Sequence, residues 1–158
     1  MRKHYNYLGK QITRNKEYVP ADEKYFDESG KPRYDKWIQH GDQYGFDKRY
    51  RDENGRYVSR IILPKGKKIV RYGDNNGSYS TDYGIDYYSL SLPYKKESMP
   101  YHEYYVVKDC EVDCIVDKGV AAPGFSSKGG GIQYRHYVSI HDSIMDGVLK
   151  EDFEWISK

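Results

Sequence analysis

Two short stretches of the sequence each combine a strong hydrogen-bonding side chain with glycines and tyrosines. Residues 71–80 read RYGDNNGSYS and begin with Arg71, and residues 122–134 read APGFSSKGGGIQY and contain Gln133 after three consecutive glycines. Glycine lets a backbone approach a ligand closely, and an aromatic ring beside a fixed donor can hold that ligand. We therefore interpret the two stretches as two walls of one cleft.

Arg71 follows a predicted strand and precedes a glycine-bearing turn. A guanidinium group can bind two phosphate oxygens at once, and the backbone amides of such a turn can add to the contact. By spacing alone, a surface arginine paired with Asp74 or Asp82 is the commoner arrangement. Tyr79 could stack on a base, although a tyrosine in a strand more often packs within the sheet.

Gln133 carries a neutral amide that can both donate to and accept from sugar hydroxyl groups. The three glycines before it suit either a loop that touches a substrate or a flexible hinge. His102 could act as an acid or a base, whereas isolated histidines are more often structural. His136 and His141 have no metal-ligand spacing with a carboxylate, and the sequence contains no P-loop, zincin or dinucleotide-binding fingerprint.

The composition limits the class of protein. The chain has 158 residues, which fits one domain with its own core, and 19 of these residues are tyrosine. Tyrosine favours half-buried strands and carries a polar tip, so a β-rich structure is expected. The 26 basic and 24 acidic residues nearly cancel to a net charge of +2, so we expect neither a nucleic acid nor a membrane as partner.

Residues 1–9 contain no apolar segment of the kind that a signal peptide requires. Either the protein stays inside the cell, or the chain is a piece of a larger exported protein. Cys110 and Cys114 would lie about 13 Å apart in an extended strand, too far for a disulfide, whereas a turn at residues 111–113 could bring them together. Two cysteines without a nearby histidine fall short of the four ligands of a zinc site, so we expect a structural role and no metal.

The periodicities predict an α+β fold, with a mostly antiparallel central sheet, short helices and long loops. Ala21 begins a possible short helix that extends to residue 26, and Ser139 is a candidate N-cap for a helix whose apolar positions recur up to residue 149. Residues 74–77 predict a hairpin-like reversal. Strands are predicted at residues 57–63, 67–72, 87–93, 104–107, 112–116 and 133–138.

Taken in order, these segments resemble the tuberculosis-necrotizing-toxin domain, a family of NAD glycohydrolase toxins. The resemblance covers roughly residues 45–151, and the glycine-glutamine stretch is its specific part. The matching segments are GF at 45–46, LPKGKKIVRYG at 63–73, GSYS at 77–80, LP at 92–93, YHEYYV at 101–106, APGFSSKGGGIQY at 122–134 and SIHDSIMDGVL at 139–149. The resemblance implies an ADP-ribosylating-toxin-like fold. It divides the chain into an N-terminal extension packed on the body (1–44) and a single globular catalytic domain (45–158).

The resemblance implies hydrolysis of the bond between nicotinamide and ribose in NAD⁺ and NADP⁺, which releases nicotinamide and ADP-ribose. NAD⁺ is then the substrate, and no cofactor is expected. Carried over by position, the catalytic residues are Gln133 at the nicotinamide ribose, Arg71 at the diphosphate, and His102. The substrate-binding residues are Phe46, Tyr72, Gly73, Tyr79 and Gly131.

This sequence departs from the family pattern at one position, because the family has a second phosphate-binding arginine just before its LP segment. Here that region reads Ser89-Leu90-Ser91. Arg60, Lys95 or Lys96 would have to substitute, and the preference between NAD⁺ and NADP⁺ stays open.

The resemblance also implies a monomeric toxin that is secreted or delivered into a target cell, as the C-terminal part of a larger exported protein. A cognate immunity protein would plug its cleft. Two other functions remain open. An ADP-ribosyltransferase would pass the ribose to a protein acceptor and usually needs a catalytic glutamate, for which Glu103 and Glu111 are the mid-chain candidates. A non-enzymatic, tyrosine-rich binding module would leave NAD⁺ unconsumed.

Overall fold

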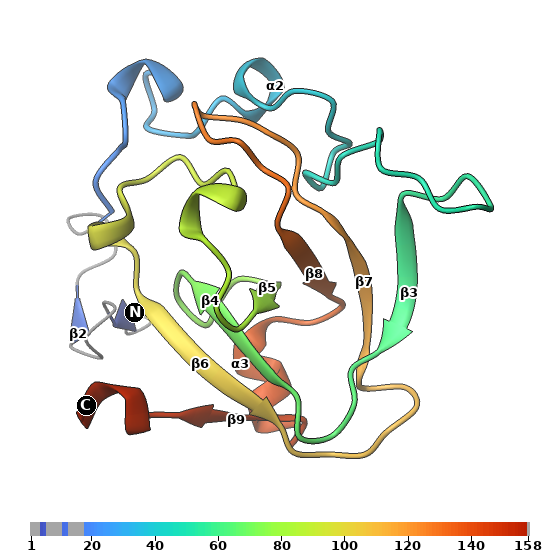
Figure 1. Cartoon of the computed structure of the whole chain (residues 1–158). Helices are drawn as coiled ribbons and strands as arrows, with labels where there is room; N and C mark the ends of the chain where they lie inside the picture. The colour runs from blue at the N-terminus through green and yellow to red at the C-terminus, as the bar shows by residue number, and fades with distance from the viewer. Residues whose placement is uncertain (1–3, 6–10, 13–17, 158) are drawn as a thin grey trace.

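An antiparallel sheet of seven strands, in the order β3-β7-β8-β5-β4-β6-β9, forms the body of the chain (Figure 1). The computed structural model describes residues 4–5, 11–12 and 18–157. The strands of this sheet are β3 (Val58–Ile62), β4 (Lys68–Tyr72), β5 (Tyr79–Asp82), β6 (Tyr101–Val106), β7 (Ile115–Val120), β8 (Ile132–His136) and β9 (Leu149–Asp152). The predicted α+β class with a mostly antiparallel sheet is therefore confirmed.

The helices are short, as predicted. The α-helices are α2 (Tyr34–Trp37) and α3 (Ile140–Met145), and the 3₁₀ helices are η1 (Glu23–Tyr25), η2 (Tyr87–Ser89), η3 (Lys96–Ser98) and η4 (Glu154–Ser157). Two further short strands, β1 (His4–Tyr5) and β2 (Gln11–Ile12), pair with each other. No helix in the described ranges has the length and apolar character needed to cross a bilayer.

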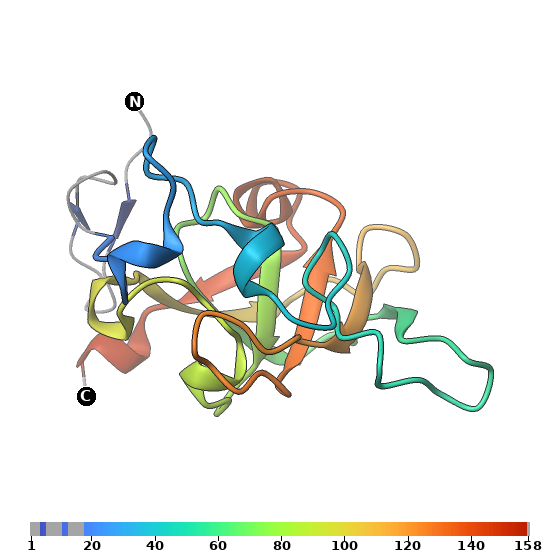
Figure 2. The same ribbon diagram turned by 90° about the horizontal axis from the view of Figure 1, so that it is seen from above.

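One face of the sheet forms the core together with α3. Ile69 of β4, Tyr104 of β6 and Tyr134 of β8 belong to one buried cluster with Ile140 of α3. Figure 2 shows α3 on one side of the sheet and the segment that carries η2 on the other. Ser139 caps α3 by accepting a hydrogen bond from the backbone N–H of Asp142, which confirms the predicted helix start.

The predicted C-terminal helix is wrong beyond residue 145. Gly147 has a φ of +75°, a left-handed conformation that ends the helix and turns the chain back to the sheet. Leu149 then begins β9, which pairs with β6 so that Leu149 lies opposite Val106. The helical spacing of the apolar residues continued into a segment that is instead an edge strand.

Two other predicted strands also differ from the structure. Residues 87–93 were expected to form an edge strand, but they contain η2, whose start is capped by the side chain of Asp86. Ser91 follows with a φ of +55°, which is incompatible with a strand. Strand β7 starts only at Ile115, because a disulfide joins Cys110 to Cys114 across a turn, with their Cα atoms 5.7 Å apart.

The described part of the N-terminal segment contacts the body of the protein. Pro20 pairs with Tyr94 in an isolated bridge, and Ile38 pairs in the same way with Gly124. The helix expected at residues 21–26 is present as the shorter η1. Most of the first seventeen residues of the predicted extension lie outside the described residues, so the division of the chain at residue 44 stays a prediction.

Candidate active site

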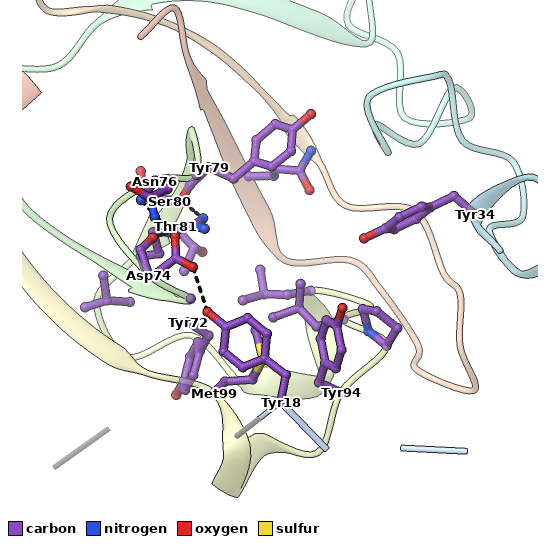
Figure 3. Close-up of a pocket in the computed structure, with 18 residues that line it drawn as sticks. Tyr18, Tyr34, Tyr72, Asp74, Asn76, Tyr79, Ser80, Thr81, Tyr94 and Met99 are labelled. Atoms are coloured by element: carbon purple, nitrogen blue, oxygen red, sulfur yellow. Dashed lines mark hydrogen bonds between the residues drawn. The ribbon is translucent and has the colours of Figure 1, made fainter. Parts of the chain in front are cut away.

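A cleft lies against the sheet face opposite α3 and consists of two adjoining pockets. The first pocket has a volume of about 320 Å³ and is lined by residues of β4, β5 and the turn between them (Figure 3). The second has a volume of about 700 Å³ and is lined by parts of residues 34–45 and 90–92. The residues that line both pockets are Tyr34, Tyr79, Leu90, Leu92 and Gln133. Arg71 and Gln133 both line the first pocket, so the two stretches singled out in the sequence share one cleft.

Arg71 is held at the end of β4 by backbone carbonyl groups. Its Nε donates to the carbonyl of Asp74 at 2.6 Å and its Nη1 donates to the carbonyl of Tyr79 at 2.8 Å. A guanidinium group has five N–H donors, so donors remain for an anionic ligand. Gly73 and Gly77 leave the space that the guanidinium occupies, because a Cβ atom at Gly73 would lie 2.7 Å from Nη2 and one at Gly77 would overlap the group.

Gln133 lies on β8, between the two pockets. Its Nε2 donates to the carbonyl of Tyr44 at 3.1 Å, which fixes the orientation of the amide. The amide oxygen is therefore the atom that remains to accept a hydrogen bond from a ligand or to face a positive charge. The ring of Tyr44 itself packs on the guanidinium of Arg135, with a centroid distance of 3.8 Å.

Five tyrosines line the first pocket, and of these only Tyr72 and Tyr79 were predicted from the sequence. Tyr18 donates to the Oδ2 atom of Asp74 at 2.9 Å, as Figure 3 shows. Desolvation raises the pKa of Tyr18, and it raises that of Tyr34 although this side chain is 54% exposed, so both hydroxyl groups are protonated donors at neutral pH. Tyr18, Tyr34 and Tyr94 lie in no recognisable motif, and the high tyrosine content was the only signal for them.

Ser80 and His136 form a buried pair behind the first pocket. The Nε2 atom of His136 lies 2.7 Å from the Oγ atom of Ser80, and Ser80 also lines the pocket. Burial, followed by the nearby charge of Arg71, lowers the pKa of His136 to about 4. His136 is therefore neutral at physiological pH and adds no charge to the cleft.

Comparison with known proteins identifies the family to which the chain that carries this site belongs. The profile described as "Tuberculosis necrotizing toxin" matches residues 62–151, which is more than half of the chain. The chain belongs to the tuberculosis necrotizing toxin family. The matched range includes Arg71 and Gln133, whereas Tyr18, Tyr34 and Tyr44 lie before it.

The relatives of this toxin-family chain differ in how much of it they cover. It is 32% identical over 100 residues to the "Conidial surface nicotinamide adenine dinucleotide glycohydrolase nadA" of Aspergillus fumigatus, a match that covers 59% of this chain and 41% of that protein. The chain therefore spans about two fifths of the length of this curated relative. A solved structure of tuberculosis necrotizing toxin with its immunity factor IFT is 21% identical, with a TM-score of 0.49, and covers 86% of this chain and 77% of that chain. A complex of Rhs1-CT with its cognate immunity protein RhsI1 is 20% identical, with a TM-score of 0.43, and covers 60% of this chain and 76% of that chain.

His102, predicted as a catalytic residue, lies outside the cleft of this family member. It is 3% exposed, lines neither pocket, and stacks on Tyr104 of the core. Its Nδ1 atom lies 2.6 Å from the Oε2 atom of Glu151 on β9. Although His102 lies directly opposite Arg71 in the β4–β6 pair, the guanidinium of Arg71 extends to the turn while the imidazole stays against the core.

Phe46 and Gly131, predicted to bind substrate, also line neither pocket. Phe46 is 1% exposed and packs on Gly119, where a Cβ atom would lie 2.5 Å from the phenyl ring. The backbone N–H of Gly131 donates to the carbonyl of Ser89 at 3.0 Å. Both residues support the loops around the cleft, and the ligand-facing contribution of the GF segment comes from Gly45, which lines the second pocket.

Charged groups are unevenly distributed in the cleft. Among the described residues that line the two pockets, Arg71 is the single lysine or arginine. The possible substitutes Arg60, Lys95 and Lys96 line neither pocket. The lining carboxylates are Asp74 in the first pocket and Asp35 and Asp42 in the second. Within the described ranges, no group of three histidine, cysteine or acidic residues could hold a metal ion.

Proposed function

We propose that this chain hydrolyses the bond between nicotinamide and ribose in NAD⁺ and NADP⁺, producing nicotinamide and ADP-ribose. The observation that carries the proposal is that Arg71 and Gln133, which come from separate strands, line the same cleft. Family membership supports it, as does the name of the Aspergillus fumigatus relative, a nicotinamide adenine dinucleotide glycohydrolase.

The reaction needs positioning more than a strong base. Nicotinamide leaves as a neutral molecule from a cationic pyridinium, so the transition state resembles an oxocarbenium ion on the ribose. The Arg71 guanidinium, aimed by two carbonyl groups, holds the diphosphate. The Gln133 amide oxygen, fixed by the bond from Nε2 to Tyr44, stabilises the positive charge that develops on the ribose. Water then adds its oxygen to C1′ and releases a proton.

Water is favoured over a protein as the acceptor of the ribose. Glu103 is 4% exposed and pairs with Lys68 at 2.6 Å, and neither it nor Glu111 lines the cleft. An ADP-ribosyltransferase would need such a glutamate beside the scissile bond. Free ADP-ribose, with no labelled protein, is therefore the expected product.

A fluorescent assay of NAD⁺ consumption tests the proposal. Gln133→Ala is expected to lower kcat by about 10²- to 10³-fold, the effect of removing one preorganised polar group. Arg71→Ala is expected to lower kcat/KM, because the diphosphate loses its cation. Gln39→Ala and Arg56→Ala are matched controls, since both are exposed and line neither pocket. Wild-type protein that leaves NAD⁺ intact would refute the proposal and favour the binding-module alternative.

We also infer that the chain acts as a monomer and is secreted or delivered into a target cell, as the toxin part of a larger exported protein. The family description as a toxin supports this inference. An enzyme that empties the NAD⁺ pool harms the cell that makes it, so the producer requires an immunity protein that covers the cleft. Expression without a partner is expected to deplete cellular NAD⁺ and arrest growth, and unchanged NAD⁺ and growth would contradict the inference.

A further inference from the structure

Tyr44 contacts β8 at two points on one face of that strand. Its carbonyl accepts a hydrogen bond from Nε2 of Gln133 at 3.1 Å, and its ring lies over the guanidinium of Arg135 at a centroid distance of 3.8 Å. Gln133 and Arg135 are two positions apart on β8, so their side chains extend from the same face of the sheet. Tyr44 therefore connects Gln133, which lines both pockets, with Arg135, which lines neither.

A local turn shapes the backbone at Tyr44 but does not place it on the sheet. The backbone N–H of Tyr44 donates to Oδ1 of Asp42, and the N–H of Gly45 donates to the carbonyl of Asp42. At the far end of this turn, the carbonyl of Gly45 accepts from the backbone N–H of Ala122 at 2.9 Å, which attaches that end to the body of the protein. At the near end, the stack on Arg135 attaches the ring of Tyr44 to the sheet.

Arg135 is itself held from the strands on both sides of β8. Asp117 lies directly opposite it on β7, and the Oδ2 atom of Asp117 is 3.6 Å from Nη1 of Arg135. Tyr79 lies directly opposite it on β5. Desolvation raises the pKa of Tyr79, and the nearby charge of Arg135 partly lowers it, so the guanidinium lies close to that hydroxyl group. A planar guanidinium fixed in this way is a suitable surface for a tyrosine ring.

We propose that Arg135 is a positioning residue, which holds the ring of Tyr44 so that the Tyr44 carbonyl orients the amide of Gln133. The inference rests on the proposed function, and it adds to the site a residue that lines neither pocket. Gln133 can stabilise charge on the ribose only while its amide oxygen faces the ligand. A reacting group displaced by about 1 Å can lose about 10²-fold in rate, so a small movement of the turn is enough to matter.

The two ligand-binding side chains should respond differently to the loss of Arg135. Tyr79 also orients a side chain, since its carbonyl accepts from Nη1 of Arg71 at 2.8 Å. Tyr79 belongs to β5, however, whose backbone is held between β4 and β8, whereas Tyr44 lies in a turn outside the strands. Loss of Arg135 should therefore disturb Gln133 and leave Arg71 in place. In kinetic terms, kcat falls while KM changes little.

Substitutions at Arg135 separate this role from a general structural one. Arg135→Ala is expected to lower kcat about 10- to 50-fold and to leave KM within about twofold of the wild type. The loss should disappear when Gln133 is already alanine, because both changes act on the same amide. Arg60→Ala is the matched control, because Arg60 also stacks on a tyrosine, Tyr137, and also lies opposite Asp117. It removes the same charge from the same face of the sheet and should leave kcat unchanged.

Changes at Tyr44 test the other half of the contact. Tyr44→Phe keeps both the ring and the carbonyl, so kcat should stay within about twofold of the wild type. Tyr44→Ala keeps the carbonyl and loses the ring, so it should repeat the loss of Arg135→Ala. Arg135→Lys keeps the charge and loses the planar group, so its kcat should lie between those of the wild type and Arg135→Ala. A wild-type kcat in Arg135→Ala, or an equal loss in Arg60→Ala, would overturn the proposal.

Hydrogen exchange of the Gln133 side chain tests the positioning without turnover. In NMR spectra of the full chain, the Nε2 signal of Gln133 is identified by its absence in Gln133→Ala. Exchange of the donated proton with water should be slow in the wild type and Arg60→Ala, and about five- to tenfold faster in Arg135→Ala and Tyr44→Ala. An exchange rate that Arg135→Ala leaves unchanged would refute the positioning role alone. The expected exchange rates in a protein that leaves NAD⁺ intact would refute the proposed function alone.

Discussion

Replacing Gly77 with alanine tests whether the exact placement of the Arg71 guanidinium matters. Gly77 is outside the left-handed region, so alanine can adopt its backbone conformation. The added Cβ would nevertheless overlap the guanidinium group, which must then leave the carbonyl groups of Asp74 and Tyr79. The substitution keeps every charge of the cleft and changes only where the cation points.

The magnitude follows from the contacts that are lost. A hydrogen bond between charged groups is worth about 1.5–3 kcal/mol. If the displaced guanidinium of Arg71 loses one such bond to the diphosphate, kcat/KM falls by about 10- to 150-fold. Gly84→Ala provides the opposite case, because Gly84 has a φ of +85° and no atom lies within 4 Å of the added Cβ. It is expected to cost about 1 kcal/mol of stability and leave kcat/KM unchanged.

The assay combines NAD⁺ turnover with thermal unfolding for Gly77→Ala, Gly84→Ala, Arg71→Ala and the double variant of residues 71 and 77. Because Gly77→Ala acts through the guanidinium, it should add little to Arg71→Ala. Two results would contradict this prediction. One is a Gly77→Ala protein with wild-type kcat/KM, and the other is a double variant whose loss of transition-state stabilisation, in free energy, equals the sum of the two single losses.

Three further predictions concern stability and the position of α2. His136 has a folded-state pKa of about 4 against a usual 6.5, so between these pH values the unfolded chain binds a proton that the folded chain does not bind. Urea unfolding should therefore show the full free energy of unfolding above pH 6.5 and a loss of up to about 3 kcal/mol by pH 4. The loss should be shallower in His136→Asn. Replacing Cys110 and Cys114 by serine should lower the free energy of unfolding by about 2 kcal/mol, the loop-closure entropy of a five-residue loop. Reduction of the wild type should lower Tm in the same way, and an unchanged Tm would mean that the disulfide does not form. Gly124→Ala should raise KM for NAD⁺, because the new Cβ would lie 2.7 Å from the carbonyl of Trp37 and push α2 away from the cleft.

Sequence periodicity predicted most of the sheet because some strands carry an alternating pattern, as in β6, where Tyr104 and Val106 are buried and Tyr105 between them is exposed. It failed where tertiary contacts decide the structure. Leu149 continues a helical apolar pattern, yet it pairs with Val106 because Gly147 has already reversed the chain. The tyrosines and serines of residues 87–91 resemble an edge strand, but local capping by Asp86 favours a 3₁₀ turn.

The sequence predicted the candidate site only where a side chain that can bind a ligand stands beside glycines. Arg71 and Gln133 stand beside glycines that a core does not need, and both line the cleft. Phe46 also stands beside a glycine, Gly45, but its own ring packs against Gly119 of β7 and does not line the cleft. Tyr34 and Asp35 reach the cleft only because α2 is held against residues 124–125, a contact between distant segments that no local pattern encodes.

The strand order gives β5 an importance that its four residues do not suggest. It lies between β4, which carries Arg71, and β8, which carries Gln133. Because neighbouring strands are about 4.8 Å apart, this single intervening strand fixes the distance between those two strands at roughly 10 Å. Changes in the surrounding loops leave this spacing unaltered, because β5 alone separates the two strands. Inserting a strand between β4 and β8, or removing β5, would alter the length of the ligand that Arg71 and Gln133 can contact at once.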